Sequence, residues 1–324
     1  MRRVVRLYAS AGPGEGRGHL ARALSLAEAG WPAGVEVELA VVRGEPTLDE
    51  GRRAEAAGAR LIDADAPLPA GSVVVLDVPR PDMRIAGVAT DRLVVFDDSH
   101  RFRGEAAIVV QPSLPEWSGS ARAGRVLAGY RWAPIGAAWR AWIDRAHEAR
   151  VDGRPQVVVC FGGSDPHDVT GRLAAALLDD EGWSTTVVVG ADYRGRASGV
   201  TGPVRDPGDL PARVATADLA VIGAGTMKFE VAAVGRPALL LAVADDQVPV
   251  GPPFAATGAA RWLGDGRTID PGTVRAAVAD LLADEPSRVA MAAAARDQVD
   301  GAGADRLAAE IAALSGKSDQ ASAS

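Results

Sequence analysis

The segment GEGRGHLARALSLAEAG, residues 14–30, joins a glycine-rich loop to a helical pattern. It follows the apolar run VVRLY at 4–8, which predicts a buried strand. A helix is expected over 19–29, where alanines and leucines recur without a helix breaker. Glycine lets a ligand approach the backbone, and free N–H groups at a helix start favour anions. The segment therefore predicts a strand–loop–helix unit of a parallel α/β sheet with a binding loop.

The same alternation of apolar strands and helical stretches continues along the chain, in two series. Further strands are expected over 35–42, 73–78, 93–98, 106–111, 156–161, 185–190, 219–224 and 238–243. Further helices are expected over 49–59, 168–178, 226–234, 273–283, 286–299 and 304–314. Continuous apolar strands separated by helices indicate parallel sheets covered on both faces.

A polar stretch at 144–156 separates the two series and predicts a domain boundary near residue 150. We expect an N-terminal Rossmann-like domain over 1–150 and a C-terminal nucleotide-binding Rossmann-like domain over 151–314, facing each other across a cleft. The helical segments 286–299 and 304–314 are candidates to pack back across the boundary. Residues 315–324, rich in serine, predict a disordered tail.

Composition narrows the class of protein. The chain has 324 residues, 48% of them hydrophobic, and a net charge of −7. An acidic balance argues against nucleic acid or an anionic membrane surface as a partner. No run approaches the roughly 20 apolar residues of a membrane span, and no signal peptide is evident, so we expect a cytoplasmic protein. Cys160 is the single cysteine, which excludes an intrachain disulfide and a thiolate metal site.

His19 stands where the glycine loop enters the first helix, after Gly16 and Gly18. The positive end of the helix dipole disfavours imidazolium and favours neutral imidazole, which can act as a general base. Arg22, three positions on, shares its helix face. The alternative is a histidine at a turn with no chemistry.

The same loop matches the loose dinucleotide fingerprint Gly-x-Gly-x-x-Ala. That fingerprint requires an acidic residue at the end of the second strand, and Glu45 comes too late. A nicotinamide cofactor is therefore not expected.

A second glycine loop follows the strand predicted over 156–161, in the sequence CFGGSDPHDVTGRL at 160–173. Gly162, Gly163 and Ser164 come directly at the carboxyl end of this strand and predict a cradle for a diphosphate or nucleotide. The alternative is a tight turn before a helix capped by Asp168.

A third loop follows the strand predicted over 219–224 and contains Gly225 and Thr226. Glu230 lies one helical turn after Thr226, where its carboxylate could accept hydrogen bonds from ribose hydroxyls. Asp246 and Gln247 end the next strand and point toward the same edge of the sheet, where ligands bind in open parallel sheets. The alternative for Glu230 is an ordinary surface glutamate.

Acidic residues also end two strands of the first series. Asp97 and Asp98, with His100, form a candidate cleft-lining loop, with a divalent metal site as the weaker alternative. Asp77 ends another strand, where it either contacts substrate or caps a turn.

Together the motifs resemble one family. Gly-x-Gly-His-x-x-Arg, then Phe-Gly-Gly-Ser-Asp, then Gly-x-Gly-Thr-x-x-x-Glu followed by Asp-Asp-Gln resemble the PseG/SpsG-type nucleotide-sugar hydrolases. These have the GT-B fold of the MurG-type glycosyltransferases. FDDSHR at 96–101 and YRWAPIGAAWR at 130–140 are similar to further segments of the family, so the resemblance covers nearly the whole chain.

The resemblance implies a two-domain GT-B enzyme in which His19 activates water against the anomeric carbon of a nucleotide sugar, with no metal and no cofactor. We expect the nucleotide sugar to be a UDP-sugar. Met227 and Lys228 stand where the family often has smaller residues. Two other functions remain open: sugar transfer to an acceptor, and non-catalytic nucleotide-sugar binding. The implied substrate-binding residues are Gly16, Gly18, Arg22, Asp97, Asp98, Gly162, Gly163, Ser164, Gly225, Thr226, Glu230, Asp246 and Gln247.

Overall fold

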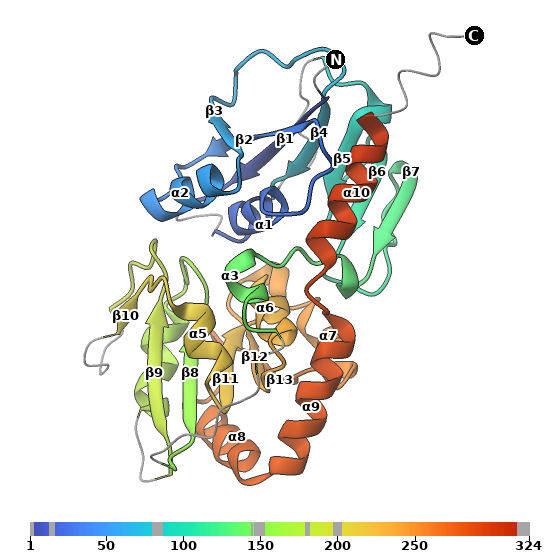
Figure 1. Cartoon of the computed structure of the whole chain (residues 1–324). Coiled ribbons are helices and arrows are strands. Elements are labelled where there is room, and N and C mark those ends of the chain that lie inside the picture. The colour runs from blue at the N-terminus through green and yellow to red at the C-terminus, as the bar shows by residue number, and fades with distance from the viewer. Residues whose placement is uncertain are drawn as a thin grey trace. The chain divides into compact units, whose positions relative to one another are not determined.

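The computed structural model describes residues 3–12, 17–79, 87–143, 145, 153–178, 182–196 and 203–315. The chain divides into two compact units (Figure 1). Unit 1 comprises Met1–Ala137 and Gly301–Ser324, and unit 2 comprises Ala138–Asp300. None of the helices in the described part is long and apolar enough to cross a membrane.

The described residues of unit 1 form a sheet of seven parallel strands in the order β3-β2-β1-β4-β5-β6-β7. Its strands are β1 (Arg3–Ser10), β2 (Val35–Arg43), β3 (Arg60–Ile62), β4 (Val73–Asp77), β5 (Leu93–Phe96), β6 (Glu105–Gln111) and β7 (Arg122–Ala128). Its helices are α1 (Gly18–Ala27), α2 (Leu48–Ala56), η1 (Thr90–Arg92), η2 (Tyr130–Trp132) and α10 (Gly303–Ser315). The strand order reverses between β1 and β4, which is where doubly wound sheets bind ligands.

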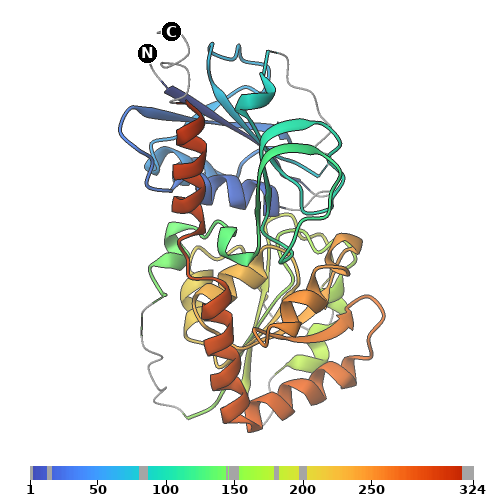
Figure 2. The same cartoon turned by 90° about the vertical axis from the view of Figure 1, so that its right-hand side faces the viewer.

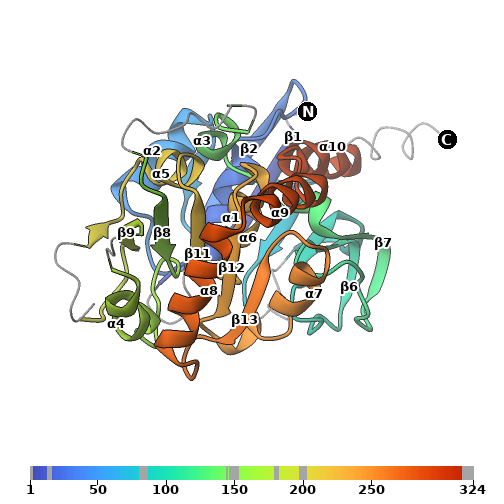
Figure 3. The same ribbon diagram turned by 90° about the horizontal axis from the view of Figure 1, so that it is seen from below.

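The described residues of unit 2 repeat this order with six parallel strands, β10-β9-β8-β11-β12-β13 (Figure 3). They are β8 (Gln156–Cys160), β9 (Ser184–Val189), β10 (Val204–Arg205), β11 (Leu219–Gly223), β12 (Ala238–Ala242) and β13 (Arg261–Asp265). The helices are α4 (Val169–Leu173), η3 (Ala174–Leu177), α5 (Leu210–Ala215), α6 (Met227–Ala233), η4 (Asp245–Gln247), α7 (Gly251–Ala256), α8 (Pro271–Ala283) and α9 (Glu285–Gln298), with α3 (Ala137–Arg140) at the point where the sequence passes from unit 1 to unit 2. Here the order reverses between β8 and β11.

The central strands of each sheet are largely apolar because side chains on both of their faces are buried. In β1, Val5 and Leu7 pack into one buried cluster with α1, and Tyr8 packs into a second cluster on the opposite face. Because both faces are covered, the strands appear in the sequence as continuous apolar runs. Every strand predicted from these runs is present, with bounds within two residues of those expected.

The helix α10 packs on unit 1, against α1, β1 and β4 (Figure 2). Leu307 and Ile311 are fully buried in the same apolar cluster as Leu7. The predicted bounds group 304–314 with the second domain, but the contacts assign this helix to unit 1, which confirms the expectation that this segment packs back across the boundary. Proximity along the chain suggests the first assignment, but burial of one apolar face of α10 on the first sheet determines the second.

Candidate functional site

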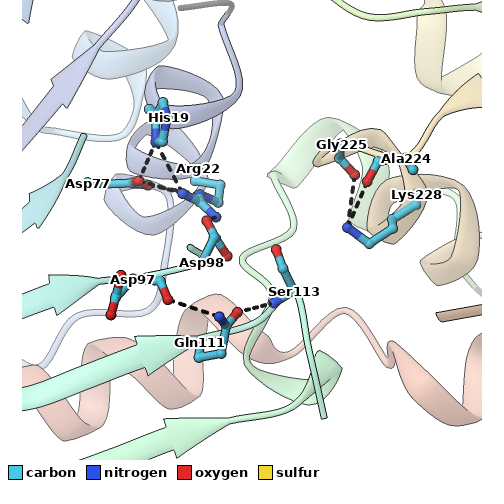
Figure 4. A network of polar contacts seen from close by, with 10 residues as sticks. All are labelled: His19, Arg22, Asp77, Asp97, Asp98, Gln111, Ser113, Ala224, Gly225 and Lys228. Carbon is cyan, nitrogen blue, oxygen red and sulfur yellow. Dashed lines mark hydrogen bonds and ion pairs between the residues drawn. The ribbon is translucent and has the colours of Figure 1, made fainter. Parts of the chain in front are cut away.

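His19 lies at the edge of the first sheet where the strand order reverses. Gly18 begins α1, and His19 follows in its first turn. The Nδ1 atom of His19 is 2.7 Å from Oδ1 of Asp77, the last residue of β4 (Figure 4). A carboxylate accepts hydrogen from Nδ1, so this contact leaves Nε2 as the acceptor nitrogen of the ring. The His19 side chain is 21% exposed, which leaves the ring accessible to a ligand.

Arg22 is buried beside His19 and joins two carboxylates (Figure 4). Its Nε donates to Oδ2 of Asp77 at 2.9 Å, and Nη2 donates to Oδ1 at 2.5 Å. Its Nη1 donates to Asp98, and the guanidinium lies 5.0 Å from the ring centroid of Phe96. Burial lowers the pKa of Arg22, but the two aspartates outweigh it and raise this pKa above its usual value. Arg22 is therefore a fixed cation that holds both carboxylates.

Asp98 is ionised in this cluster. Burial alone raises the pKa of Asp98, but the Arg22 guanidinium, with a smaller contribution from Ser113, reverses this effect and holds the pKa below its usual value. The Asp98 side chain as a whole is 28% exposed, but its Oδ1 atom is buried and its Oδ2 accepts from Arg22.

Asp97, by contrast, stabilises the loops that follow β5 and β6 through hydrogen bonds. It is 1% exposed. Its Oδ1 accepts from the Arg101 amide at 2.8 Å, and its Oδ2 accepts from Nε1 of Trp117 at 3.1 Å. Nε2 of Gln111 donates to the Asp97 carbonyl at 2.9 Å, and Oε1 of Gln111 accepts from the Ser113 amide at 2.8 Å (Figure 4). The polar atoms of Asp97 are thus used within the fold.

The alternative of a metal site at Asp97, Asp98 and His100 finds no support in the part of the chain that the structure describes, where no group of three or more histidine, cysteine or acidic side chains could hold a metal ion. Nδ1 of His100 instead lies 2.9 Å from Oγ of Ser118, and its ring packs edge-on to Trp117.

The glycine loop after β8 packs on the loop after β9. Gly162 has φ +97°, a conformation that side chains rarely adopt. The Gly163 carbonyl accepts from the Asp192 amide at 3.1 Å. A Cβ on Gly190 would lie 2.3 Å from the Gly163 backbone, so this close approach requires glycine at 190. Both glycines predicted for the nucleotide cradle are therefore in a tightly constrained loop.

The two aspartates of this loop cap the short helix α4. Asp165 accepts from the amides of Val169 at 2.9 Å and Thr170 at 2.7 Å, and Asp168 accepts from Gly171 at 3.0 Å. Burial raises the pKa of Asp165, against the lowering effect of these amides. The predicted cap at Asp168 is confirmed. Ser164, predicted to bind the nucleotide, is 8% exposed.

Gly225 and Gln247 meet at the third loop, between β11 and α6. Oε1 of Gln247 accepts from the Val243 amide at 3.2 Å, which fixes the orientation of the carboxamide. Its Nε2 then lies beside Gly225, where a Cβ would be only 3.1 Å away. Thr226 immediately precedes α6, Glu230 lies on α6 and is partly exposed, and Asp246 is exposed on η4.

Lys228 lies under this loop and is 2% exposed. Its Nζ donates to the carbonyls of Ala224 at 3.0 Å and Gly225 at 3.3 Å (Figure 4). The ammonium also lies 4.0 Å from the ring centroid of Phe229. Lys228 thus binds the backbone of the glycine loop directly.

Each unit therefore brings together residues that are distant in sequence. In unit 1, these are Gly18, His19, Arg22, Asp77 and Asp98; in unit 2, Gly225 and Gln247 meet, while Gly162, Gly163 and Ser164 share the loop after β8. Gly16 lies outside the described residues. The sequence left two roles open for Asp77, contact with substrate or capping of a turn. The pairing of β4 with β1 instead places it beside His19. Lys228 was visible in the sequence only as a departure from the family pattern.

Comparison with known proteins adds evidence on the fold. No protein-family model matches the sequence, and no curated protein matches it. Several solved structures do match over nearly the whole chain. MurG of Acinetobacter baumannii is 17% identical with a TM-score of 0.54, covering 96% of this chain and 99% of its own. The spinosyn rhamnosyltransferase SpnG, complexed with thymidine diphosphate, is 18% identical with a TM-score of 0.56 and the same coverage.

A putative UDP-N-acetylglucosamine 2-epimerase from Listeria monocytogenes is also similar, at 12% identity and a TM-score of 0.53, with 96% of each chain covered. Glycosyltransferases and an epimerase thus share this architecture. At such low identity the similarity shows the fold, while the reaction must be inferred from the site. The chain has a GT-B-like fold, built from two parallel α/β domains.

Proposed function

We propose that the chain is an enzyme that transfers a sugar from a nucleoside-diphosphate sugar to a hydroxyl group of an acceptor, with His19 as the general base. One observation carries this function: His19 is partly exposed, and Asp77 holds its Nδ1 at 2.7 Å. A histidine oriented by a buried carboxylate is well suited to proton abstraction from a hydroxyl, because the carboxylate fixes the tautomer and stabilises the imidazolium.

In the proposed reaction, Nε2 of His19 takes the proton of the acceptor hydroxyl. The acceptor oxygen forms a bond to the anomeric carbon, and the bond from this carbon to the diphosphate oxygen breaks. The diphosphate leaves with the electron pair. The carboxylate of Asp77 stabilises the imidazolium that results, and Arg22 holds Asp77 in place through two hydrogen bonds.

The donor would be held by the glycine loops of unit 2. Gly162, Gly163 and Ser164 are assigned to the nucleotide, Gly225 and Thr226 to the diphosphate, Glu230 to the ribose, and Asp246 and Gln247 to the sugar. Gly18 and Asp98 are assigned to the sugar and acceptor side, together with Gly16. Asp97, also predicted from the sequence to bind substrate, is assigned instead to the support of the adjoining loops, because its polar atoms are bonded within the fold. The similarity to SpnG in complex with thymidine diphosphate supports a nucleoside diphosphate as ligand. We propose a UDP-sugar as the donor and the cytoplasm as the place of the reaction.

Hydrolysis is the second candidate, with water in place of the acceptor. The order of the three glycine motifs, which resembles the PseG/SpsG-type hydrolases, favours it. The same base serves both reactions, because water and a sugar hydroxyl lose a proton in the same way.

The test is incubation of the purified chain with UDP-, TDP-, GDP- and CMP-sugars, with and without an acceptor panel. Transfer predicts nucleotide release that depends on an acceptor, and hydrolysis predicts free sugar without one. The His19→Ala variant should lose turnover and retain nucleotide affinity by calorimetry. Full turnover by that variant would rule out His19 as the base. Nucleotide binding with no turnover under any condition would instead indicate a non-catalytic binding protein.

A further inference from the structure

The ammonium of Lys228 is the feature of unit 2 that the proposed reaction leaves unexplained. It is buried below the loop joining β11 to α6 and donates to two successive carbonyls of that loop, at 3.0 and 3.3 Å. Hydrogen bonds from a charged donor are stronger than neutral ones and fix their acceptors firmly.

These two hydrogen bonds set the direction of two amides. The described residues contain no cis peptide bond, and in a trans peptide the C=O and N–H groups point in opposite directions. The Ala224 carbonyl shares its peptide plane with the amide of Gly225, and the Gly225 carbonyl with that of Thr226. Since both carbonyls point toward Lys228, both amides point away from it. Nε2 of Gln247 lies beside the same glycine.

A lysine suits position 228 better than an arginine would. The chain contains two lysines, Lys228 and Lys317, among its 35 lysine and arginine residues. Apart from Lys317, every other lysine-or-arginine position of the chain holds arginine, including the buried Arg22. A guanidinium is planar and wide, whereas a compact ammonium can sit under a tight loop and donate in three directions.

We propose that Lys228 is a positioning residue that orients the loop amides of Gly225 and Thr226 toward the diphosphate of the donor. This role rests on the proposed function, because it concerns the site that would bind the diphosphate of the donor. Lys228 acts through these amides, without contact between its Nζ and the ligand.

The test compares UDP binding, or binding of the nucleoside diphosphate that the wild type prefers, in Lys228→Met and Arg288→Met by calorimetry. Arg288 is a matched control, because its guanidinium also donates to two backbone carbonyls of unit 2, those of Leu281 and Leu282. We expect affinity to fall about tenfold or more in Lys228→Met, the effect of losing a charged hydrogen bond, and to stay unchanged in Arg288→Met. Circular dichroism should show both variants folded at the temperature used.

Equal affinity of Lys228→Met and wild type would overturn the role of Lys228 alone. Failure of the wild type to bind any nucleoside diphosphate would overturn the proposed function and this role with it. If Lys228→Met does not fold, the wild type labelled with ¹⁵N at lysine Nζ gives the answer. Its two ammonium signals can be assigned with Lys317→Arg, and saturating nucleotide must shift the Lys228 signal. An unchanged Lys228 signal would contradict the proposal.

Discussion

Arg22 binds Asp77 through two nitrogens, with Nε 2.9 Å from Oδ2 and Nη2 2.5 Å from Oδ1. The Oδ1 atom also contacts His19. One carboxylate therefore orients the candidate base and is itself oriented by a buried cation. Residues from helix α1 and strand β4 therefore set the direction of the imidazole.

Replacing Asp77 by Asn should lower kcat by about 100-fold or more, because an amide can stabilise the wrong tautomer of His19 and carries no charge to balance imidazolium. The measurement is turnover of the nucleotide sugar identified in the panel. Asp49→Asn serves as the control, because that side chain is 72% exposed on α2. Activity within about twofold of wild type in Asp77→Asn would exclude a role for this carboxylate in the reaction.

The low pKa of Asp98 predicts how stability depends on pH. A carboxyl whose pKa is lower in the folded state stabilises the fold above its unfolded pKa of about 4, and this contribution is lost as the pH falls through the folded value. Wild type should therefore exceed Asp98→Asn in free energy of unfolding by a constant amount above about pH 5, and the difference should shrink below about pH 4. Urea unfolding from pH 3 to pH 7 measures it.

Asp209→Asn is the control for this series. A hydrogen bond from Arg213 also lowers the pKa of Asp209, but that carboxylate is on the surface, where water screens the pair. The pH-dependent difference should be smaller than for Asp98. A larger one would mean that burial of the Arg22 cluster has little effect.

Gly190→Ala should destabilise unit 2 and weaken nucleotide binding. The added methyl group would meet the Gly163 backbone at 2.3 Å, so the loop carrying Gly162 and Gly163 must move. We expect a loss of about 1–3 kcal/mol in the free energy of unfolding, the usual cost of overpacking. Gly208→Ala is matched to it, since a Cβ at that position meets nothing within 4 Å. Equal Tm values for the two variants would contradict the close approach.

Cys160 should be inert in the folded protein. Burial raises the pKa of its thiol to about 12, so that only about one molecule in 10⁴ carries a thiolate at pH 8. Reaction with a chromogenic disulfide reagent at pH 8 should be negligible without denaturant and reach one equivalent in guanidinium. Rapid reaction of the native protein would show that the end of β8 opens readily.

The strands that sequence patterns missed share one property. β3 and β7 are the two edges of the first sheet, and β10 and β13 are the two edges of the second. An edge strand is not enclosed on both sides, so it needs no continuous apolar run and can carry charge. In β7, with the sequence RAGRVLA, both arginines are exposed. The central strands, buried on both faces, were all predictable from their residues.

The residues of the candidate site also differ in how far the sequence predicts their contacts. The relation of His19 to Arg22 follows from helical spacing alone, and the structure confirms it, since Nη2 of Arg22 lies 3.2 Å from Nδ1 of His19. Asp77 lies 58 positions from His19, and its contact depends on which strand pairs with β1. Such pairing is set by the packing of the whole sheet, which a local pattern does not encode.

The packing of α10 on unit 1 has a consequence for the order of events during synthesis. Leu307 and Ile311 complete an apolar cluster that begins with Val5 and Leu7, yet the ribosome makes them only after the whole of unit 2. Unit 2, which is continuous in sequence, can close its core while the chain is still growing. Unit 1 can complete its apolar cluster only after α10 has been made, so its sheet exposes hydrophobic surface for longer than that of unit 2 and is the part more prone to aggregation during synthesis.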